Sequence, residues 1–144
     1  MKEKNTLLIV DDYEFNRYML CNAFSDRNII EAENGFRAIE EYERHKDEIC
    51  AVLTDLMMPV LDGFGLLEYF QKNKYTEEIP VFVITADNSA KSLTKAHDMG
   101  AQDYISKPFN IQFIRRRVNN IIELFELRKK LDAHKDKDEY SDMV

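Results

Sequence analysis

The 144-residue sequence contains no long apolar run and only two cysteines, and both shortages exclude classes of protein. No stretch approaches the roughly 18 apolar residues that a membrane-spanning helix needs. The first five residues, Met1-Lys2-Glu3-Lys4-Asn5, precede a run of only four apolar residues, Leu7 to Val10, which are too few for the core of a signal peptide. Cys21 and Cys50 belong to no CxxC or Cys/His cluster, so we expect no zinc site. These absences favour a cytoplasmic protein that does not bind a membrane.

Two common phosphate-binding motifs and a basic surface are also missing. Asp11-Asp12-Tyr13-Glu14 follows the first apolar segment, where GxGxxG would stand, and GxxxxGK[ST] occurs nowhere in the chain. A dinucleotide-binding or P-loop protein is therefore disfavoured. The formal net charge of -7 argues against direct nucleic-acid binding, which needs a basic surface. A hydrophobic content of 44% and a charged content of 33% instead indicate an ordinary globular protein of one domain.

Short apolar segments alternate five times with segments of helical periodicity. Strands are predicted at Thr6–Val10, Ile29–Ala32, Ala51–Thr54, Val81–Ile84 and Tyr104–Ile105. Helices are predicted at Glu14–Phe24, at Phe36–His45, at Gly63–Lys72 behind an Asp62 cap, from a Ser89 cap to His97, and from Asn110 onward. This alternation implies right-handed crossovers, and strands without polar alternation are buried on both faces. We therefore predict a doubly wound α/β domain, an α-β-α sandwich with a five-stranded parallel sheet and five helices.

The last predicted helix is longer than the sheet requires. Leu124, Leu127 and Leu131 continue its three-four apolar spacing past the expected edge of the domain, so Asn110 to Leu131 would span about 33 Å. Two interpretations stay open, a frayed amphipathic end and a helical stalk that joins a second copy or an absent domain. We divide the chain into a domain over 5–126 and a helical extension over 127–144. The polar residues 132–144 are expected to be disordered.

Polar side chains stand where four of the predicted strands end. They are the Asp11-Asp12 pair, Asp55, Thr85 and Lys107. In an open parallel sheet, ligands bind beyond the carboxyl ends of the strands, so these groups should share one pocket. Carboxylates about 4 Å apart repel by roughly 4 kcal/mol per pair at an effective dielectric near 20, which calls for a cation. Mg²⁺ prefers hard oxygen ligands, and the Asp55 carboxylate is a possible nucleophile toward phosphorus. Thr85 and Lys107 supply a hydroxyl donor and a positive charge for phosphoryl oxygens.

Several motifs, in this order and spacing, resemble those of the receiver domain of bacterial two-component response regulators, the CheY-like family. They are Ile9-Val10-Asp11-Asp12, Asp55-Leu56-Met57-Met58-Pro59 with Asp62-Gly63, Ile84-Thr85-Ala86, Gly100-Ala101, and Asp103-Tyr104-Ile105-Ser106-Lys107-Pro108-Phe109. The resemblance runs from about Leu7 to Phe125. It implies a flavodoxin-like fold with strand order 2-1-3-4-5, in which Gly63 and Pro108 have structural roles.

The resemblance also implies what each site residue does. Asp55 matches the phosphoacceptor, which takes a phosphoryl group from a sensor histidine kinase or a phosphotransfer protein. Asp12 and Asp55 match carboxylate ligands of Mg²⁺, with Mn²⁺ as a possible substitute, and the backbone carbonyl of Met57 matches the third protein ligand. Asp11 matches the acid that reaches the metal through water. Lys107 matches the lysine that pairs with the phosphoryl group.

Thr85 and Tyr104 resemble the pair whose hydroxyl and ring move on phosphorylation, and Pro108 matches a proline that often follows the lysine in a cis bond. The resemblance implies a phosphorylation-controlled signalling module rather than an enzyme. Such a module catalyses only its own phosphorylation and dephosphorylation. A partner or a second copy would dock on the fourth helix, fifth strand and last helix, or along the C-terminal helix.

Two alternatives belong to other functional classes. A magnesium-dependent aspartyl-phosphate hydrolase of the haloacid dehalogenase type would carry a DxD motif after its first strand, and Asp11-Asp12-Tyr13 lacks that spacing. A scaffold that binds its partner without phosphorylation is the second alternative. The sequence identifies neither the kinase, nor the stimulus, nor an output domain.

Overall fold

The computed structural model describes residues 4–142, with side chains as far as Ala133. Five strands form one parallel sheet in the order β2-β1-β3-β4-β5. The strands are β1 (Thr6–Val10), β2 (Asn28–Ala32), β3 (Ile49–Thr54), β4 (Val81–Thr85) and β5 (Asp103–Ser106). The predicted fold class and strand order are confirmed, and each strand begins and ends within two residues of its predicted bounds.

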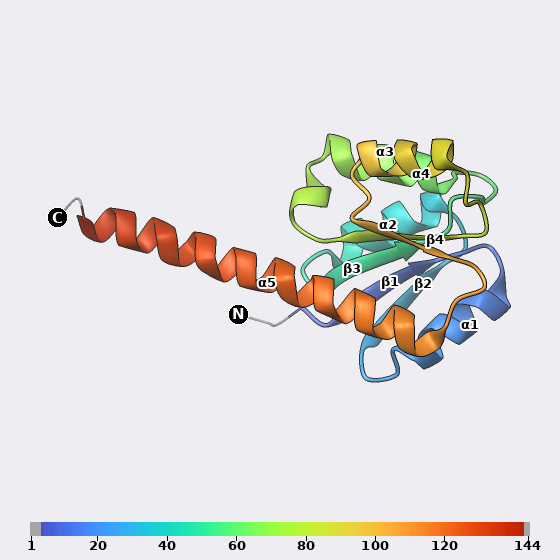
Figure 1. Ribbon diagram of the computed structural model, residues 1–144, viewed down its shortest axis with the longest axis horizontal. Coiled ribbons are helices and arrows are strands. Elements are labelled where there is room, and N and C mark those ends of the chain that lie inside the picture. The colour runs from blue at the N-terminus through green and yellow to red at the C-terminus, as the bar shows by residue number, and fades with distance from the viewer. Residues whose placement is uncertain (1–3, 143–144) are drawn as a thin grey trace.

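Five α-helices cover the two faces of the sheet. They are α1 (Glu14–Ala23), α2 (Gly35–His45), α3 (Gly63–Lys72), α4 (Ala90–Asp98) and α5 (Ile111–Asp142), with a short 3₁₀ helix η1 (Tyr75–Glu77) that the sequence did not predict. Figure 1 shows α2, α3 and α4 on one face and α1 with α5 on the other. Both predicted caps are confirmed, since Asp62 accepts a hydrogen bond from the Gly65 amide and Ser89 accepts one from the Ser92 amide.

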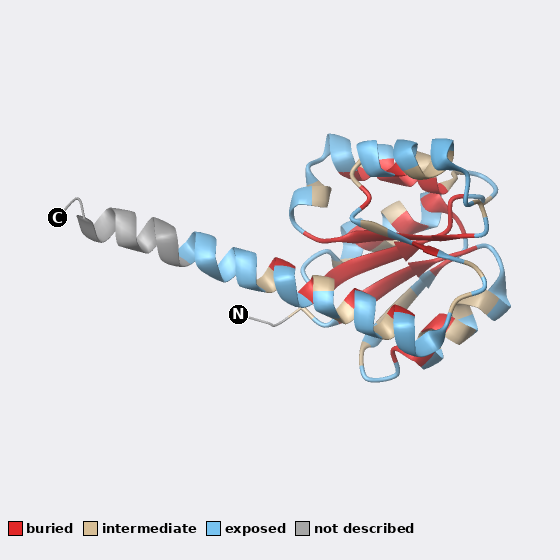
Figure 2. Ribbon diagram, viewed as in Figure 1, coloured by how far each residue is buried: buried red, intermediate tan, exposed pale blue. Residues whose placement is uncertain are grey.

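Each face of the sheet has its own apolar core, and successive residues of a strand point alternately into the two cores. In β1, Leu8 and Val10 join the core beneath α2, α3 and α4, whereas Leu7 and Ile9 join the core beneath α1 and α5. Figure 2 shows the three inner strands, β1, β3 and β4, buried between helices whose outer surfaces are exposed. Burial on both sides explains why these three strands are nearly continuous apolar runs in the sequence.

Helix α5 packs on the sheet through its first half and then leaves the domain. Ile114, Val118, Ile122 and Phe125 are buried, whereas Leu124, Leu127 and Leu131 are exposed. In Figure 1 the second half of α5 projects well beyond the sheet. The helix is nevertheless too polar to cross a bilayer, and no other helix in the described part of the chain is long and apolar enough to do so.

The end of α5 differs from the sequence-based expectation. We expected residues 132–144 to be disordered, but the backbone remains helical to Asp142, and residues 143–144 lie outside the described residues. Neither glycine nor proline occurs between Ile111 and Asp142 to end the helix, and charged residues such as lysine and glutamate are good helix formers. The domain boundary near residue 126 stays a prediction.

Tyr42 of α2 carries a hydroxyl that the core does not satisfy. Its ring is fully buried and packs against Phe70 and Tyr75 at centroid distances of 4.6 and 4.8 Å. The hydroxyl oxygen has no hydrogen-bond partner among the described residues. Burial raises the pKa of Tyr42, so the phenol stays protonated. A buried polar group without a partner opposes folding.

We expect Tyr42→Phe to raise the free energy of unfolding by about 1 kcal/mol, because it removes an unpaired hydroxyl and keeps the ring contacts. Urea denaturation measures the change. The matched control is Tyr75→Phe, which loses a 2.7 Å hydrogen bond to Glu43 Oε1 and should lower the free energy of unfolding by about 0.5–1.5 kcal/mol. If both variants lost the same free energy of unfolding, the Tyr42 hydroxyl could not be unpaired in the folded protein.

Candidate functional site

The parallel register brings four strand ends to one edge of the sheet. Val10 of β1 pairs with Thr54 of β3, so the residues that follow them, Asp11 and Asp55, lie side by side. The Asp55 amide donates to the Val10 carbonyl at 3.0 Å, which continues the ladder past the strand ends. Asp11 is 2% exposed and Asp55 is 9% exposed. Two acidic side chains are therefore buried next to each other.

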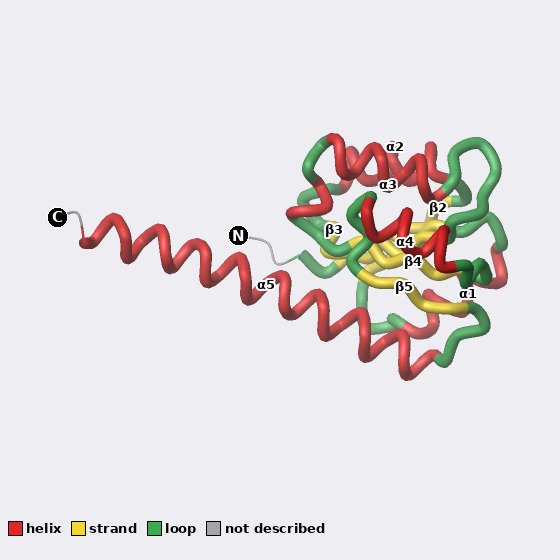
Figure 3. Tube along the Cα trace, turned by 45° about the horizontal axis from the view of Figure 1, so that its top comes forward, coloured by secondary structure: helices red, strands yellow, loops and turns green. Residues whose placement is uncertain are grey.

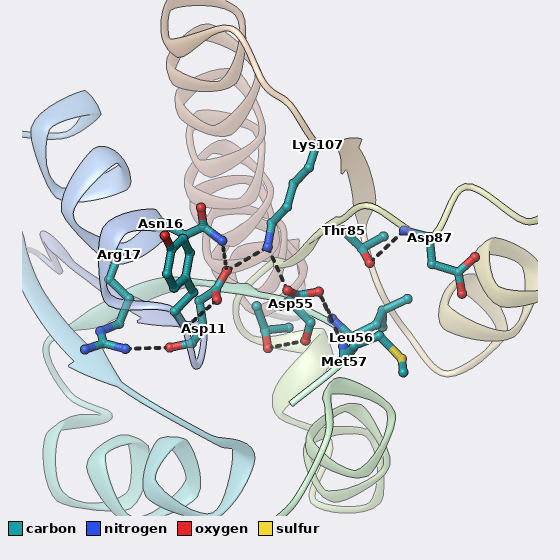
Figure 4. Close-up of polar contacts among 11 residues, drawn as sticks. Asp11, Asn16, Arg17, Asp55, Leu56, Met57, Thr85, Asp87 and Lys107 are labelled. Atoms are coloured by element: carbon teal, nitrogen blue, oxygen red, sulfur yellow. Dashed lines mark hydrogen bonds and ion pairs between the residues drawn. The ribbon is translucent and has the colours of Figure 1, made fainter. Parts of the chain in front are cut away.

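Lys107 lies between these two carboxylates. Its Nζ is 2.8 Å from Asp11 Oδ2 and 2.7 Å from Asp55 Oδ2, as Figure 4 shows. Burial of the ammonium opposes its charge, but the hydrogen bonds and the charges of Asp11 and Asp55 outweigh that effect and raise the pKa of Lys107. Lys107 therefore stays protonated at neutral pH and supplies one positive charge to two buried acids.

The Asp55 side chain is held in one orientation. Oδ1 accepts hydrogen bonds from the amides of Leu56 at 2.7 Å and Met57 at 3.3 Å, while Oδ2 faces Lys107. Gly63 packs against the same loop, and a Cβ at this position would clash with the Asp55 carbonyl oxygen. Only glycine lets the start of α3 approach the loop this closely, which supports the structural role expected of Gly63.

Asp11 is also anchored, partly by residues that the sequence analysis missed. Its Oδ1 accepts from the Tyr13 amide at 2.9 Å, and its Oδ2 accepts from Asn16 Nδ2 at 3.3 Å. Arg17 Nη1 donates to the Asp11 carbonyl at 2.8 Å. Asn16 and Arg17 lie in the first turns of α1, and their position directly after the Asp11-Asp12 pair was the available signal. Whether their side chains contact Asp11 depends on which side of α1 they occupy, and the sequence did not determine this.

The acidic residues fit a divalent cation. One carboxylate oxygen each from Asp11, Asp12 and Asp55 lies within 4.8 Å of the other two. Asp12 is exposed, so the cluster opens to solvent on one side. Clustered hard oxygen donors with an open side suit Mg²⁺, which retains several waters when it binds proteins. Met57, whose carbonyl the sequence analysis assigned as a further ligand, is adjacent and 65% exposed.

Thr85 ends β4 and Tyr104 lies on β5, and among the described residues no hydrogen bond joins their side chains. Thr85 is buried, and its Oγ1 accepts from the Asp87 amide at 3.2 Å. Tyr104 on edge strand β5 is 48% exposed and lines a hollow of about 430 Å³ between α4 and β5, together with Leu93 and His97. Figure 3 shows β5 between α4 and α5.

The strand that carries Tyr104 also delivers Lys107 to the site. The Lys107 amide donates to the Thr85 carbonyl at 2.9 Å, which extends the pairing of β4 with β5 by one residue. The Lys107–Pro108 peptide bond is cis, as the resemblance implied. The structure therefore brings Asp11, Asp12, Asp55 and Lys107 into one cluster. It places Thr85 at the end of β4 and Tyr104 on the adjacent strand β5.

Comparison with known proteins gives relatives of several lengths. Histidine kinase P4 from Formosa agariphila is 36% identical over 123 residues, which are 85% of this chain and 9% of that protein. The probable transcriptional regulator ycf29 from Pyropia yezoensis is 32% identical over 79% of this chain and 49% of that protein. Chemotaxis protein CheY-3 from Vibrio cholerae is 30% identical over 81% of this chain and 91% of that protein. The chain thus spans about half or less of the first two relatives.

Solved structures agree with the fold. The CheX-CheY-BeF3-Mg²⁺ complex from Borrelia burgdorferi contains a chain with a TM-score of 0.74 and 29% identity, covering 81% of this chain and 88% of that one. The receiver domain of the Francisella response regulator 1452 matches with a TM-score of 0.74 and 25% identity, covering 83% and 98%. A family model described as the response regulator receiver domain matches residues 7–119. The chain belongs to the response regulator receiver family, whose CheY-like fold and acidic strand-end cluster it shares.

Proposed function

We propose that this receiver domain accepts a phosphoryl group on Asp55 from the phosphohistidine of a sensor histidine kinase or phosphotransfer protein. The observation that carries the proposal is the setting of the Asp55 carboxylate. One oxygen is fixed by two backbone amides, and the other is 2.7 Å from the Lys107 ammonium, beside the Asp11 and Asp12 carboxylates. Asp11 is anchored in a similar way, but its Oδ2 accepts from both Asn16 and Lys107, whereas Asp55 Oδ2 accepts from Lys107 alone among the described residues.

The transfer would form one bond and break one. A carboxylate oxygen of Asp55 attacks phosphorus while the bond between phosphorus and the donor imidazole breaks, and the imidazole leaves with the electron pair. Lys107 then pairs with a phosphoryl oxygen, because its ammonium already lies at Asp55 Oδ2. Asp12, Asp55 and the Met57 carbonyl would hold Mg²⁺ or Mn²⁺, with Asp11 contacting it through water, and the ion would screen the repulsion between the anions.

The acyl phosphate would act as a conformational signal. Thr85 is expected to donate its hydroxyl to a phosphoryl oxygen, and the Tyr104 ring is expected to turn inward from its half-exposed position beside the hollow at α4. A partner can respond to such a change only if it binds the two states with different affinity. We place that partner, or a second copy, on α4, β5 and α5 or along the projecting end of α5. The Borrelia relative is seen in complex with CheX.

We expect acetyl phosphate with Mg²⁺ to add one phosphoryl group to the wild-type protein, and Asp55→Asn to abolish the addition, because an amide is not a nucleophile toward phosphorus. Intact-protein mass spectrometry measures both. The matched control is Asp62→Asn in the same loop, since asparagine caps a helix as well as aspartate does and the Asp62 side chain caps α3. This variant should be phosphorylated like the wild type.

Two outcomes would select the alternative functions. Rapid turnover of a generic phosphatase substrate, without a stable adduct on Asp55, would favour the hydrolase of the haloacid dehalogenase type. A folded protein that binds Mg²⁺ but gains no phosphoryl group would favour the phosphorylation-independent scaffold. Under our proposal the domain catalyses only its own phosphorylation and the later hydrolysis of the acyl phosphate.

Magnesium should stabilise the fold through the acidic cluster. At a concentration tenfold above the dissociation constant, Mg²⁺ is expected to raise the free energy of unfolding by about 1.4 kcal/mol. Asp12→Asn should largely remove this gain. Without metal the same variant should be more stable than the wild type by about 1 kcal/mol, because one of three neighbouring negative charges is gone. Thermal denaturation with and without Mg²⁺ measures both effects.

The control for charge alone is Asp47→Asn. Asp47 is exposed and precedes β3, at the end of the strand opposite to Asp55. The Asp47→Asn variant should gain as much stability from Mg²⁺ as the wild type. Equal gains in Asp12→Asn and Asp47→Asn would contradict the proposed metal site.

A further inference from the structure

Side-chain hydrogen bonds attach the loop between β4 and α4 to two different elements. The Asp87 carboxylate accepts from the Ser89 amide at 3.0 Å and from the Ser92 hydroxyl at 2.6 Å, both at the start of α4. Asn88 Oδ1 accepts from the Ser106 hydroxyl on β5 at 2.8 Å. The loop is therefore bound to α4 through Asp87 and to β5 through Asn88.

The attachment through Asp87 makes the loop and the start of α4 one unit. The hydrogen bonds from Ser92 and Ser89 lower the pKa of Asp87, and a carboxylate is favourable at a helix N-terminus. In Figure 4 the Asp87 side chain points away from Asp55. The Asp87 amide also donates to Thr85 Oγ1. The hydroxyl that should move on phosphorylation is thus bonded to the same unit.

The bond from Asn88 to Ser106 instead crosses between this unit and β5. Ser106 and Tyr104 are two residues apart on β5, so both side chains lie on its exposed face. The backbone ladder holds Ser106 opposite Thr85 in β4. If the Thr85 hydroxyl turns toward a phosphoryl group on Asp55, the loop bonded to it moves too, while the ladder keeps β5 in register. The Asn88–Ser106 bond then has to lengthen or break.

We infer that Asn88 and Ser106 form a latch that favours the unphosphorylated arrangement and thereby lowers the affinity of the Asp55 site for a phosphoryl group. The inference rests on the proposed function and adds to it a regulatory contact of this chain. Both are positioning residues, because neither hydrogen-bonds to Asp11, Asp55 or Lys107 in the described part of the chain. A single net hydrogen bond changes an equilibrium by about two- to tenfold, which sets the scale of the effect.

The test is the affinity for beryllofluoride, a phosphoryl mimic, measured by isothermal titration calorimetry at a fixed Mg²⁺ concentration. Ser106→Ala and Asn88→Ala should each bind about two- to tenfold more tightly than the wild type. The double variant should bind no more tightly than either single variant, because all three lack the same bond. Ser106→Thr keeps the hydroxyl and should bind like the wild type. Ser25→Ala, an exposed serine between α1 and β2, is the control for serine removal.

A second readout uses the unliganded proteins. In ¹H–¹⁵N NMR spectra of Ser106→Ala, the amide signals of residues 86–89 should shift toward their positions in the beryllofluoride-bound wild type. Shifts confined to the neighbours of residue 106, together with unchanged beryllofluoride affinity, would overturn the latch. The proposed function would then stand, because wild-type binding is measured in the same series. A folded wild-type protein that bound no beryllofluoride would contradict both the proposed function and the latch.

Discussion

The balance of charge around Lys107 is the constraint on which the site depends. Two buried acids, Asp11 and Asp55, share one ammonium at 2.8 and 2.7 Å, and Asp12 adds a further carboxylate at the open side. Buried like charges are compatible with folding only when an opposite charge is near. The ammonium is available because β5 ends beside β4, which places Lys107 at the same edge of the sheet. The remaining negative charge makes the site receptive to a cation, so the chemistry that favours Mg²⁺ also limits the stability of the metal-free domain.

The same sheet separates rigid from movable parts. β1, β3 and β4 are buried on both faces and paired on both edges, so Asp11 and Asp55 directly follow strands that are held on every side. β5 has four residues and one neighbour, and its Tyr104 and Ser106 side chains are exposed. Local motion concentrates where buried contacts are few. A phosphoryl group would thus be bound on a rigid base and detected by the edge of the sheet.

Much of this arrangement is readable from the sequence because it follows from local rules. Apolar strands, helix caps at Asp62 and Ser89, and polar residues at strand ends indicate a doubly wound α/β domain and bring Asp55 and Lys107 to one edge, whereas the strand order followed from the family resemblance. Contacts that depend on which way a helical side chain faces could not be predicted, such as the hydrogen bond from Arg17 to the Asp11 carbonyl. The bond between Asn88 and Ser106 needs the register of two strands. The helical backbone to Asp142 was not predicted, because the composition of this polar segment suits both a disordered tail and a charged helix.

Two groups of elements meet at the edge of the sheet, and their connection determines how a signal could leave the site. Arg117 of α5 forms an ion pair with Asp103 at the start of β5, and Asn110 accepts a hydrogen bond from the Phe113 amide at the start of α5. β5 and α5 are therefore linked to each other, just as Asp87 links the β4–α4 loop to α4. The Asn88–Ser106 bond joins the two groups. Because the Arg117–Asp103 pair ties α5 to β5, a change in the Asn88–Ser106 bond would reach the projecting helix through β5.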